Sequence, residues 1–146
     1  MNSIMQTCRL SDQKNVKMKI EHLAIWVENL ELMKSFYEQY FGARSNHKYH
    51  NPLTHFQSYF LSFESGSRLE LMHRPDIAER QHDHLSQKEG IVHMAISTGS
   101  EAKVDQLVTA LRSDGHKIVG HPRTTGDGYY EAVVLDPEGN LIELTA

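Results

Sequence analysis

Cysteine is almost absent from this chain of 146 residues, which contains a single one, Cys8. A lone thiol has no partner for an internal disulfide, so we expect a reducing, cytoplasmic setting. Long apolar runs are also missing, which argues against a membrane-spanning helix. Residues 1–17 lack the continuous apolar segment of a secretory signal and show no helix or strand period, so they are predicted to be a disordered leader.

Runs of like charge are absent too. The chain has 15 basic and 19 acidic residues and a formal net charge of -4. This balance favours neither a nucleic acid nor an anionic membrane surface as a partner. The length is that of one domain with its own core.

What the sequence does contain is an internal repeat. The pattern His-x-Ala-Ile occurs at His22 and again at His93, each time within a segment of alternating apolar residues. Alternation of this kind is typical of a strand with one face buried. In both segments the histidine lies on the face opposite the core. The sequence therefore predicts two equivalent strands, each presenting a histidine away from the core.

A glutamate follows each of these histidines at a similar spacing. Glu70 lies 48 residues after His22 in the strand-like text RLELM, and Glu143 lies 50 residues after His93 in NLIEL. Repeats at a fixed period identify the structural unit of a fold. We infer two modules, residues 18–75 and 90–146, joined by a charged linker at residues 76–89.

Each module has the same predicted order of elements, βαβββ, which defines an α+β fold. Asn29 and Ser100 are predicted to cap the two helices at their N-termini, and Gly42 and Gly115 to end them. The segment 43–53 is polar and is expected to be irregular, as is the loop 124–128. The pattern places seven of these strands, three in the first module and four in the second: 19–27, 55–62, 67–74, 91–98, 116–120, 129–135 and 140–145.

Together, the texts EHLAIWV, FYEQYFGA, RLELM, GIVHMAIS and DPEGNLIEL resemble the vicinal-oxygen-chelate superfamily, and within it glyoxalase I-like proteins. The resemblance extends from about residue 18 to the C-terminus. It implies curved mixed sheets that form a metal-binding cleft, with His22, Glu70, His93 and Glu143 at the ligand positions. Two imidazoles and two carboxylates suit a divalent ion of nickel, cobalt, zinc, manganese or iron.

The resemblance also implies a lactoylglutathione lyase-like activity. Such an enzyme moves a proton through an enediolate in an α-hydroxycarbonyl or hemithioacetal substrate. Glu143 is the first choice for the base and Glu70 the second. A homodimer is implied as well, with each site built either from one module of each chain or within one chain. Trp26 and Met72 share the faces of His22 and Glu70, so they are predicted to line the substrate pocket, with packing in the core as the alternative.

Two positions depart from the glutathione-dependent bacterial enzymes. Those enzymes carry an arginine where this chain has Trp26 and an asparagine where it has Arg74. Trp26 offers no bidentate cationic fork for a carboxylate. The open alternatives are another thiol, a different α-hydroxycarbonyl, or a carboxylate clamp moved to Arg74 or Arg123.

Other members of the superfamily provide alternative functions. Extradiol dioxygenases and fosfomycin-modifying thiol transferases use three ligands, in which case Glu70 would not bind the metal. Bleomycin-resistance proteins bind their drug without a catalytic metal, and a complete ligand set argues against that function. His82-x-His84 in the linker is a rival cluster for which a solvated loop is expected. The remaining candidates, expected at the surface or at a pocket rim, are His47, His50 and His55.

Overall fold

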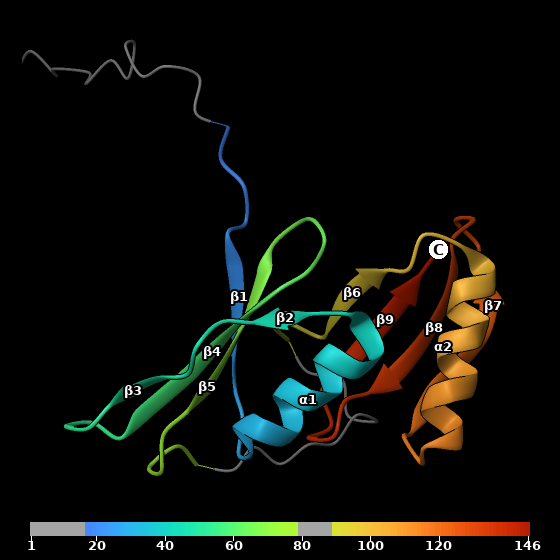
Figure 1. Ribbon diagram of the computed structural model, residues 1–146. Helices are drawn as coiled ribbons and strands as arrows, with labels where there is room; N and C mark the ends of the chain where they lie inside the picture. The colour runs from blue at the N-terminus through green and yellow to red at the C-terminus, as the bar shows by residue number, and fades with distance from the viewer. Residues whose placement is uncertain (1–16, 79–88) are drawn as a thin grey trace, which may run out of the picture.

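A computed structural model describes residues 17–78 and 89–146 and shows two modules, each with one helix and one sheet (Figure 1). Most of the predicted leader and linker therefore lies outside the described residues. The first module contains β1 (His22–Trp26), α1 (Leu30–Phe41), β2 (Arg44–Ser45), β3 (Tyr49–Asn51), β4 (Phe56–Ser62) and β5 (Arg68–His73). The second contains β6 (His93–Ser97), α2 (Glu101–Ser113), β7 (Ile118–Thr124), β8 (Tyr130–Leu135) and β9 (Leu141–Thr145).

The two sheets share one topology. The first has the strand order β1-β5-β4-β2, with β3 paired to β4, and the second has the order β6-β9-β8-β7. In each sheet the first strand runs parallel to the last one, and the other pairs are antiparallel. This confirms the α+β fold with mixed sheets. Among the described residues no strand of one sheet pairs with the other sheet, so β1 and β6 are both edge strands.

The helix ends follow the capping residues of the sequence. The Asn29 side chain accepts a hydrogen bond from the Leu32 backbone N–H at 3.0 Å, and Gly42 adopts a left-handed conformation after α1. Ser100 caps α2 in the same way through the Lys103 N–H. These caps satisfy backbone donors that a helix start leaves free. Neither helix in the described parts of the chain is long and apolar enough to span a membrane.

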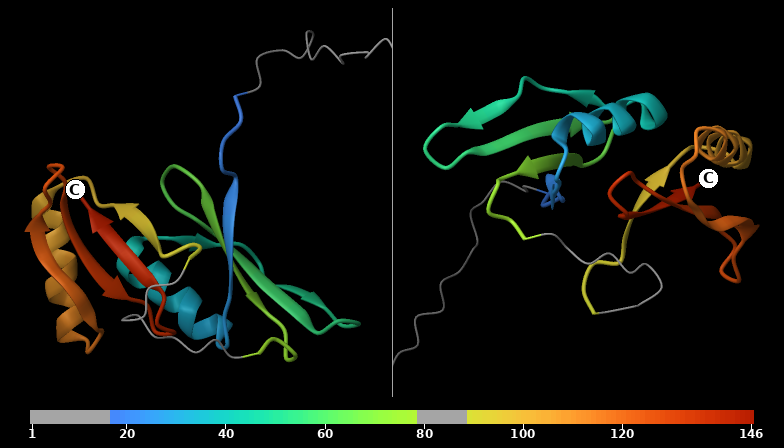
Figure 2. Two further views of the ribbon diagram at one scale, coloured as in Figure 1. Left: turned by 180° about the vertical axis from the view of Figure 1, so that it is seen from behind. Right: turned by 90° about the horizontal axis from the view of Figure 1, so that it is seen from below.

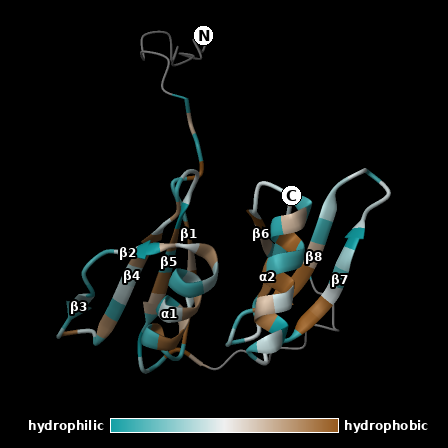
Figure 3. Cartoon of the chain, turned by 45° about the vertical axis from the view of Figure 1, so that its right-hand side comes forward, coloured by the Kyte–Doolittle hydropathy of each residue, from teal (hydrophilic) through white to brown (hydrophobic). Residues whose placement is uncertain are grey.

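Each helix covers one face of its own sheet, as the hydropathy colouring in Figure 3 and the view from below in Figure 2 show. The apolar stripe of each helix is buried against alternate residues of the central strands, and its opposite face is exposed. Because strand side chains alternate, the other face of each sheet remains available for polar groups. The buried apolar residues include Met33, Phe36, Tyr37, Tyr59, Leu61, Leu69 and Leu71 in the first module and Val104, Val108, Leu111, Ala132, Val134, Ile142 and Leu144 in the second.

The structure differs from the prediction in two segments. The polar segment 43–53 was predicted to be irregular, but it contains β2 and β3, because both pair with β4 and obtain backbone hydrogen bonds there. The strand predicted at 116–120 is β7, which runs on to Thr124 through two register shifts against β8. Such shifts are typical of β-bulges, which alter the side-chain alternation that a strand prediction relies on.

Polar contacts join the two modules. The buried Tyr37 hydroxyl on α1 donates to the carboxylate of Asp136 at 3.1 Å, in the turn between β8 and β9. In the same turn, the Glu138 carboxylate accepts the backbone N–H groups of Glu28 and Asn29 at 2.9 and 2.8 Å. Burial raises the pKa of the Asp136 carboxyl. The turn predicted from Asp136-Pro137-Glu138-Gly139 thus also connects the second module to α1 and its N-terminal end through hydrogen bonds.

Candidate functional site

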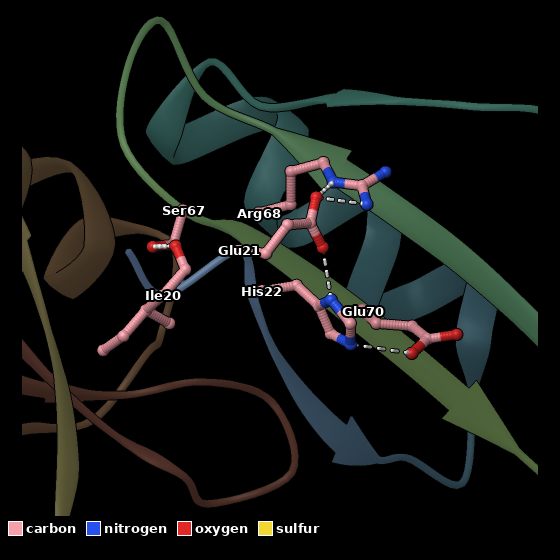
Figure 4. Close-up of polar contacts among 6 residues, drawn as sticks. All are labelled: Ile20, Glu21, His22, Ser67, Arg68 and Glu70. Atoms are coloured by element: carbon pink, nitrogen blue, oxygen red, sulfur yellow. Dashed lines mark hydrogen bonds and ion pairs between the residues drawn. The ribbon is translucent and has the colours of Figure 1, made fainter. Parts of the chain in front are cut away.

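The first pair of predicted ligands lies on neighbouring parallel strands. On the face away from α1, β1 carries His22 and β5 carries Glu70, which stands beside Ala24 in the strand register. The His22 Nε2 and Glu70 Oε2 atoms are 3.8 Å apart, and the Glu70 side chain is 14% exposed. Figure 4 shows the imidazole and the carboxylate pointing toward one another above the strands. The strand order β1-β5 therefore creates this pair from residues 48 positions apart in the sequence.

The second pair repeats this arrangement. On the edge strand β6 lies His93, and Glu143 on β9 stands beside Ala95 in the register. The His93 Nε2 and Glu143 Oε2 atoms are 3.4 Å apart, and the Glu143 side chain is 21% exposed. The duplication seen in the sequence is thus present in three dimensions, with one histidine–glutamate pair on each sheet.

Among the described residues, only the first pair has a further carboxylate bonded to the second ring nitrogen of its histidine. His22 Nδ1 lies 2.5 Å from Glu21 Oε2, and because an ionised carboxylate only accepts, the Nδ1–H donates. Arg68 donates to the same carboxylate through Nε at 2.8 Å (Figure 4). Its guanidinium carbon also lies 4.2 Å from the centroid of the Phe60 ring. The hydrogen bond from His22 and the contacts with Arg68 lower the pKa of the Glu21 carboxyl. This chain of contacts fixes the imidazole so that Nε2 faces Glu70.

The second module lacks these supporting groups. At the position of Glu21 it has Val92, and opposite His93 in the register stands Leu141 rather than an arginine. Sequence reasoning missed Glu21 because strict alternation puts a residue next to His22 on the opposite face of the sheet. Glu21 precedes the first residue of β1, so its side chain is not bound by that alternation. The sequence signal that could have indicated the role of Glu21 is its position directly before His22 in EHLAIWV.

Both pairs fit a divalent cation in chemistry and in spacing. Two ligand atoms bonded to one tetrahedral zinc ion at about 2.1 Å stand about 3.4 Å apart, and the two observed separations lie close to this value. The four predicted ligands do not gather in one place within a chain, however. Across residues 17–78 and 89–146, no three His, Cys, Asp or Glu side chains come close enough to hold one ion. Each sheet therefore supplies half of the predicted ligand set.

The predicted substrate-binding residues lie on both sheets. Trp26 and Met72 are paired in the register of β1 and β5, two residues beyond Ala24 and Glu70 and on the same face. Arg74 places its guanidinium carbon 5.7 Å from the Trp26 ring. Arg123 lies on β7, separated from β9 by β8, and pairs with Glu131 at 2.9 Å. Arg74 thus lies next to Trp26 at the end of β5, whereas Arg123 lies two strands away from Glu143.

The other histidines that the structure describes are not grouped with the predicted ligands. His47, His50 and His55 are exposed, in agreement with the surface positions expected for them. His82-x-His84 lies outside the described residues. A separate depression of about 580 Å³ opens at the start of α1 and is lined in part by Lys48 and His73. None of the four predicted ligands lines that depression, so it is distinct from the histidine–glutamate pairs.

Comparisons with known proteins agree with this fold. Solved structures with similar folds include the trypanothione-dependent glyoxalase I of Leishmania major, with 26% identity, a TM-score of 0.70 and coverage of 88% of this chain and 86% of that one. Glyoxalase I of Zea mays is 24% identical with a TM-score of 0.72, and the similar region is 87% of this chain but 44% of that one. A glyoxylase/bleomycin resistance protein/dioxygenase domain from Frankia sp. EAN1pec is 14% identical, with a TM-score of 0.74 over 88% of this chain and 97% of that one.

A curated relative matches a shorter region. The uncharacterised protein YqjT of Bacillus subtilis (strain 168) is 33% identical over 60 residues, which are 39% of this chain and 47% of that protein. Residues 19–144 match, as a whole, the Glyoxalase/Bleomycin resistance protein/Dioxygenase superfamily. That region contains both histidine–glutamate pairs and nearly all of the described residues. The chain belongs to the Glyoxalase/Bleomycin resistance protein/Dioxygenase superfamily.

Proposed function

We propose that this protein is a metal-dependent lyase or isomerase of the glyoxalase I type, acting on an α-hydroxycarbonyl or hemithioacetal substrate. The observation that carries the proposal is the duplication in space: each sheet presents one imidazole and one carboxylate, 3.8 and 3.4 Å apart, on the face that its helix leaves free. Two neutral imidazoles and two carboxylates form a ligand set for nickel, cobalt, zinc, manganese or ferrous iron.

The complete site is proposed to form between two copies of the chain. The edge strands β1 and β6 offer backbone groups that no strand among the described residues uses. The extensions that lead into them expose large apolar side chains: Ile20 is 73% and Ile91 is 72% exposed. An open apolar strand edge is a template for pairing with another chain. Pairing β1 of one copy with β6 of the other would bring the two histidine–glutamate pairs together, and twofold symmetry would form the site twice.

His22, Glu70, His93 and Glu143 would hold the cation, which would supply Lewis-acid assistance that makes the substrate C–H bond more acidic. Glu143 would take the proton from the hydroxyl-bearing carbon and return it to the neighbouring carbon, so that one C–H bond breaks and another forms, while the hydroxyl proton passes to the former carbonyl oxygen. No net oxidation occurs in this exchange. Glu143 is preferred to Glu70 as the base because Val92 and Leu141 stand where the first pair has Glu21 and Arg68, which leaves this side of the site less constrained.

Metal analysis and turnover test this function directly. Protein purified without added metal is expected to contain a stoichiometric divalent ion that the His93→Ala variant loses. With the preferred ion, it is expected to convert at least one methylglyoxal hemithioacetal, prepared with glutathione or another thiol, into the thioester. Protein that binds none of the divalent ions tested and converts no adduct would contradict the proposal. The drug-binding alternative without metal would then be preferred.

The supporting role of Glu21 can be tested separately. Residues that fix a ligating imidazole through its second nitrogen typically change metal affinity by about 10 to 100-fold. We expect Glu21→Gln to weaken metal binding about tenfold, because the neutral amide holds the His22 imidazole and Arg68 less firmly. Competition with a chromogenic chelator measures this dissociation constant without any turnover. Glu64→Gln, at an exposed turn carboxylate of the same module, is the matched control. Equal affinities in the two variants would remove Glu21 from this role.

A further inference from the structure

Three aromatic rings gather beside the first histidine–glutamate pair. Trp26 ends β1, Phe56 begins β4 and Tyr49 begins β3. The Trp26 and Phe56 rings meet edge to face with centroids 6.0 Å apart, and the Tyr49 and Phe56 rings are 6.1 Å apart. Trp26 is 42% exposed and Tyr49 is 52% exposed. We call these three residues the aromatic wall, which is an apolar surface that solvent reaches.

The aromatic wall lies on the face of the sheet that carries Glu70. The register pairs Trp26 with Met72 and Ala24 with Glu70, so Trp26 stands two residues further along the same face. Two residues of a strand span about 7 Å. A small molecule whose reacting carbons lie at Glu70 can therefore place a ring against the aromatic wall when only a few atoms link the ring to those carbons.

Arg74 gives this surface a positive charge. Its guanidinium carbon lies 5.7 Å from the Trp26 ring centroid, and its Nε donates to Asp76 Oδ1 at 2.5 Å. That contact uses one edge of the guanidinium, which leaves terminal N–H groups for a second acceptor. The Asp76 side chain is 69% exposed, so this ion pair is a weak competitor for an incoming anion. Arg123, by contrast, is held by Glu131 and has no ring contact among the described residues.

We propose that the aromatic wall and Arg74 form a subsite for an aromatic carboxylate, and that this group belongs to the substrate of the reaction proposed above. A flat ring gains edge or offset contacts with Trp26 and Phe56, and the carboxylate binds the guanidinium in a bidentate manner. The role of this subsite in the reaction rests on the proposed function. The binding of an aromatic carboxylate to Trp26, Phe56 and Arg74 does not depend on that function. It assigns the carboxylate clamp to Arg74 rather than to Arg123.

The test uses Trp26 as its own reporter, because it is the only tryptophan in the chain. The purified protein is titrated with 3-phenylpropionate, with the uncharged 3-phenylpropanamide and with the non-aromatic hexanoate, and Trp26 fluorescence is followed. We expect saturable quenching by 3-phenylpropionate, weaker binding of the amide and the weakest binding of hexanoate. An absence of saturable quenching, or equal affinities for 3-phenylpropionate and hexanoate, would overturn the proposal.

Variants separate the two parts of the subsite. Arg74→Gln is expected to weaken 3-phenylpropionate binding by about tenfold to a hundredfold and to leave amide binding unchanged, because only the charge-assisted hydrogen bonds are lost. Arg74→Lys is expected to retain part of the affinity, and Phe56→Leu to weaken both aromatic ligands. Arg44→Gln, at an exposed arginine of the same module, is the control and is expected to bind like the original protein. Wild-type binding of 3-phenylpropionate by Arg74→Gln would refute the clamp.

Different experimental results would contradict the subsite and the proposed reaction. Binding of 3-phenylpropionate with no turnover of any adduct would retain the subsite and refute the lyase. Turnover of aliphatic adducts without ring-dependent binding would retain the lyase and refute the subsite. Where both hold, Arg74→Gln is expected to raise KM for a carboxylated aromatic hemithioacetal while kcat changes little, because the lost contact is equal in the ground and transition states.

Discussion

Replacing Glu143 by Gln is expected to lower kcat by a factor of about 10² to 10⁴ while the protein stays folded. The amide has the same shape but cannot take up a proton at neutral pH. The Glu143 side chain is 21% exposed on the open face of the sheet, and its backbone lies between Ala95 and Val133 in the register. The substitution therefore leaves the strand pairing and the core face of β9 unchanged. Turnover and metal content are measured together, with urea unfolding as the check on stability.

The matched control is Glu70→Gln, at the equivalent position of the first module. If Glu143 is the base, Glu70→Gln loses less activity than Glu143→Gln at equal metal occupancy. Wild-type turnover in Glu143→Gln would remove Glu143 from the base role and leave Glu70 as the candidate. Unchanged metal content and affinity in Glu70→Gln would favour the three-ligand arrangement of the dioxygenases and thiol transferases, in which this glutamate does not bind the ion.

The sequence predicted best the features that depend on residues close together in the chain and that occur in both modules. Alternation around His22 and His93 predicted the strands and the face on which each histidine lies, and the repeat predicted the matching modules. Asn29 and Ser100 cap their helices as expected, because a capping side chain bonds to a backbone group three residues away. The strand topology confirms the predicted fold, and the family match confirms the membership of the superfamily.

The features that sequence missed depend on contacts between distant segments. Tyr49 reaches the aromatic wall because β3 pairs with β4, and its polar surroundings in the sequence contain no strand pattern. Arg68 supports His22 only because β1 and β5 are neighbours, although 46 residues separate the two positions. The proposed meeting of the two histidine–glutamate pairs also depends on a contact between distant segments, because β1 and β6 do not pair within the described residues of one chain.

Subunit complementation is expected to reveal the shared site. His22→Ala and His93→Ala should each lose metal binding and turnover when prepared alone. In a dimer that builds each site from one module of each chain, a mixed dimer of the two variants has one site with both native histidines and one with neither. Random association gives about half mixed dimers, so about one quarter of the native metal content and activity should return. The measurement is metal content and turnover after co-refolding, with the dimer mass verified by light scattering.

The arrangement within one chain predicts no recovery, because every chain then retains its own defect. A second mixture provides the matched control: His93→Ala and Glu143→Gln both alter the second module, so every site of their mixed dimer keeps one defect in either arrangement. Recovery in the first mixture and none in the second would establish that His22 with Glu70 faces His93 with Glu143 of the other copy. Failure of the first mixture, in protein shown to contain mixed dimers, would require the two sheets of one chain to come together instead, and the contacts of Tyr37 and Glu138 that join the modules would have to break.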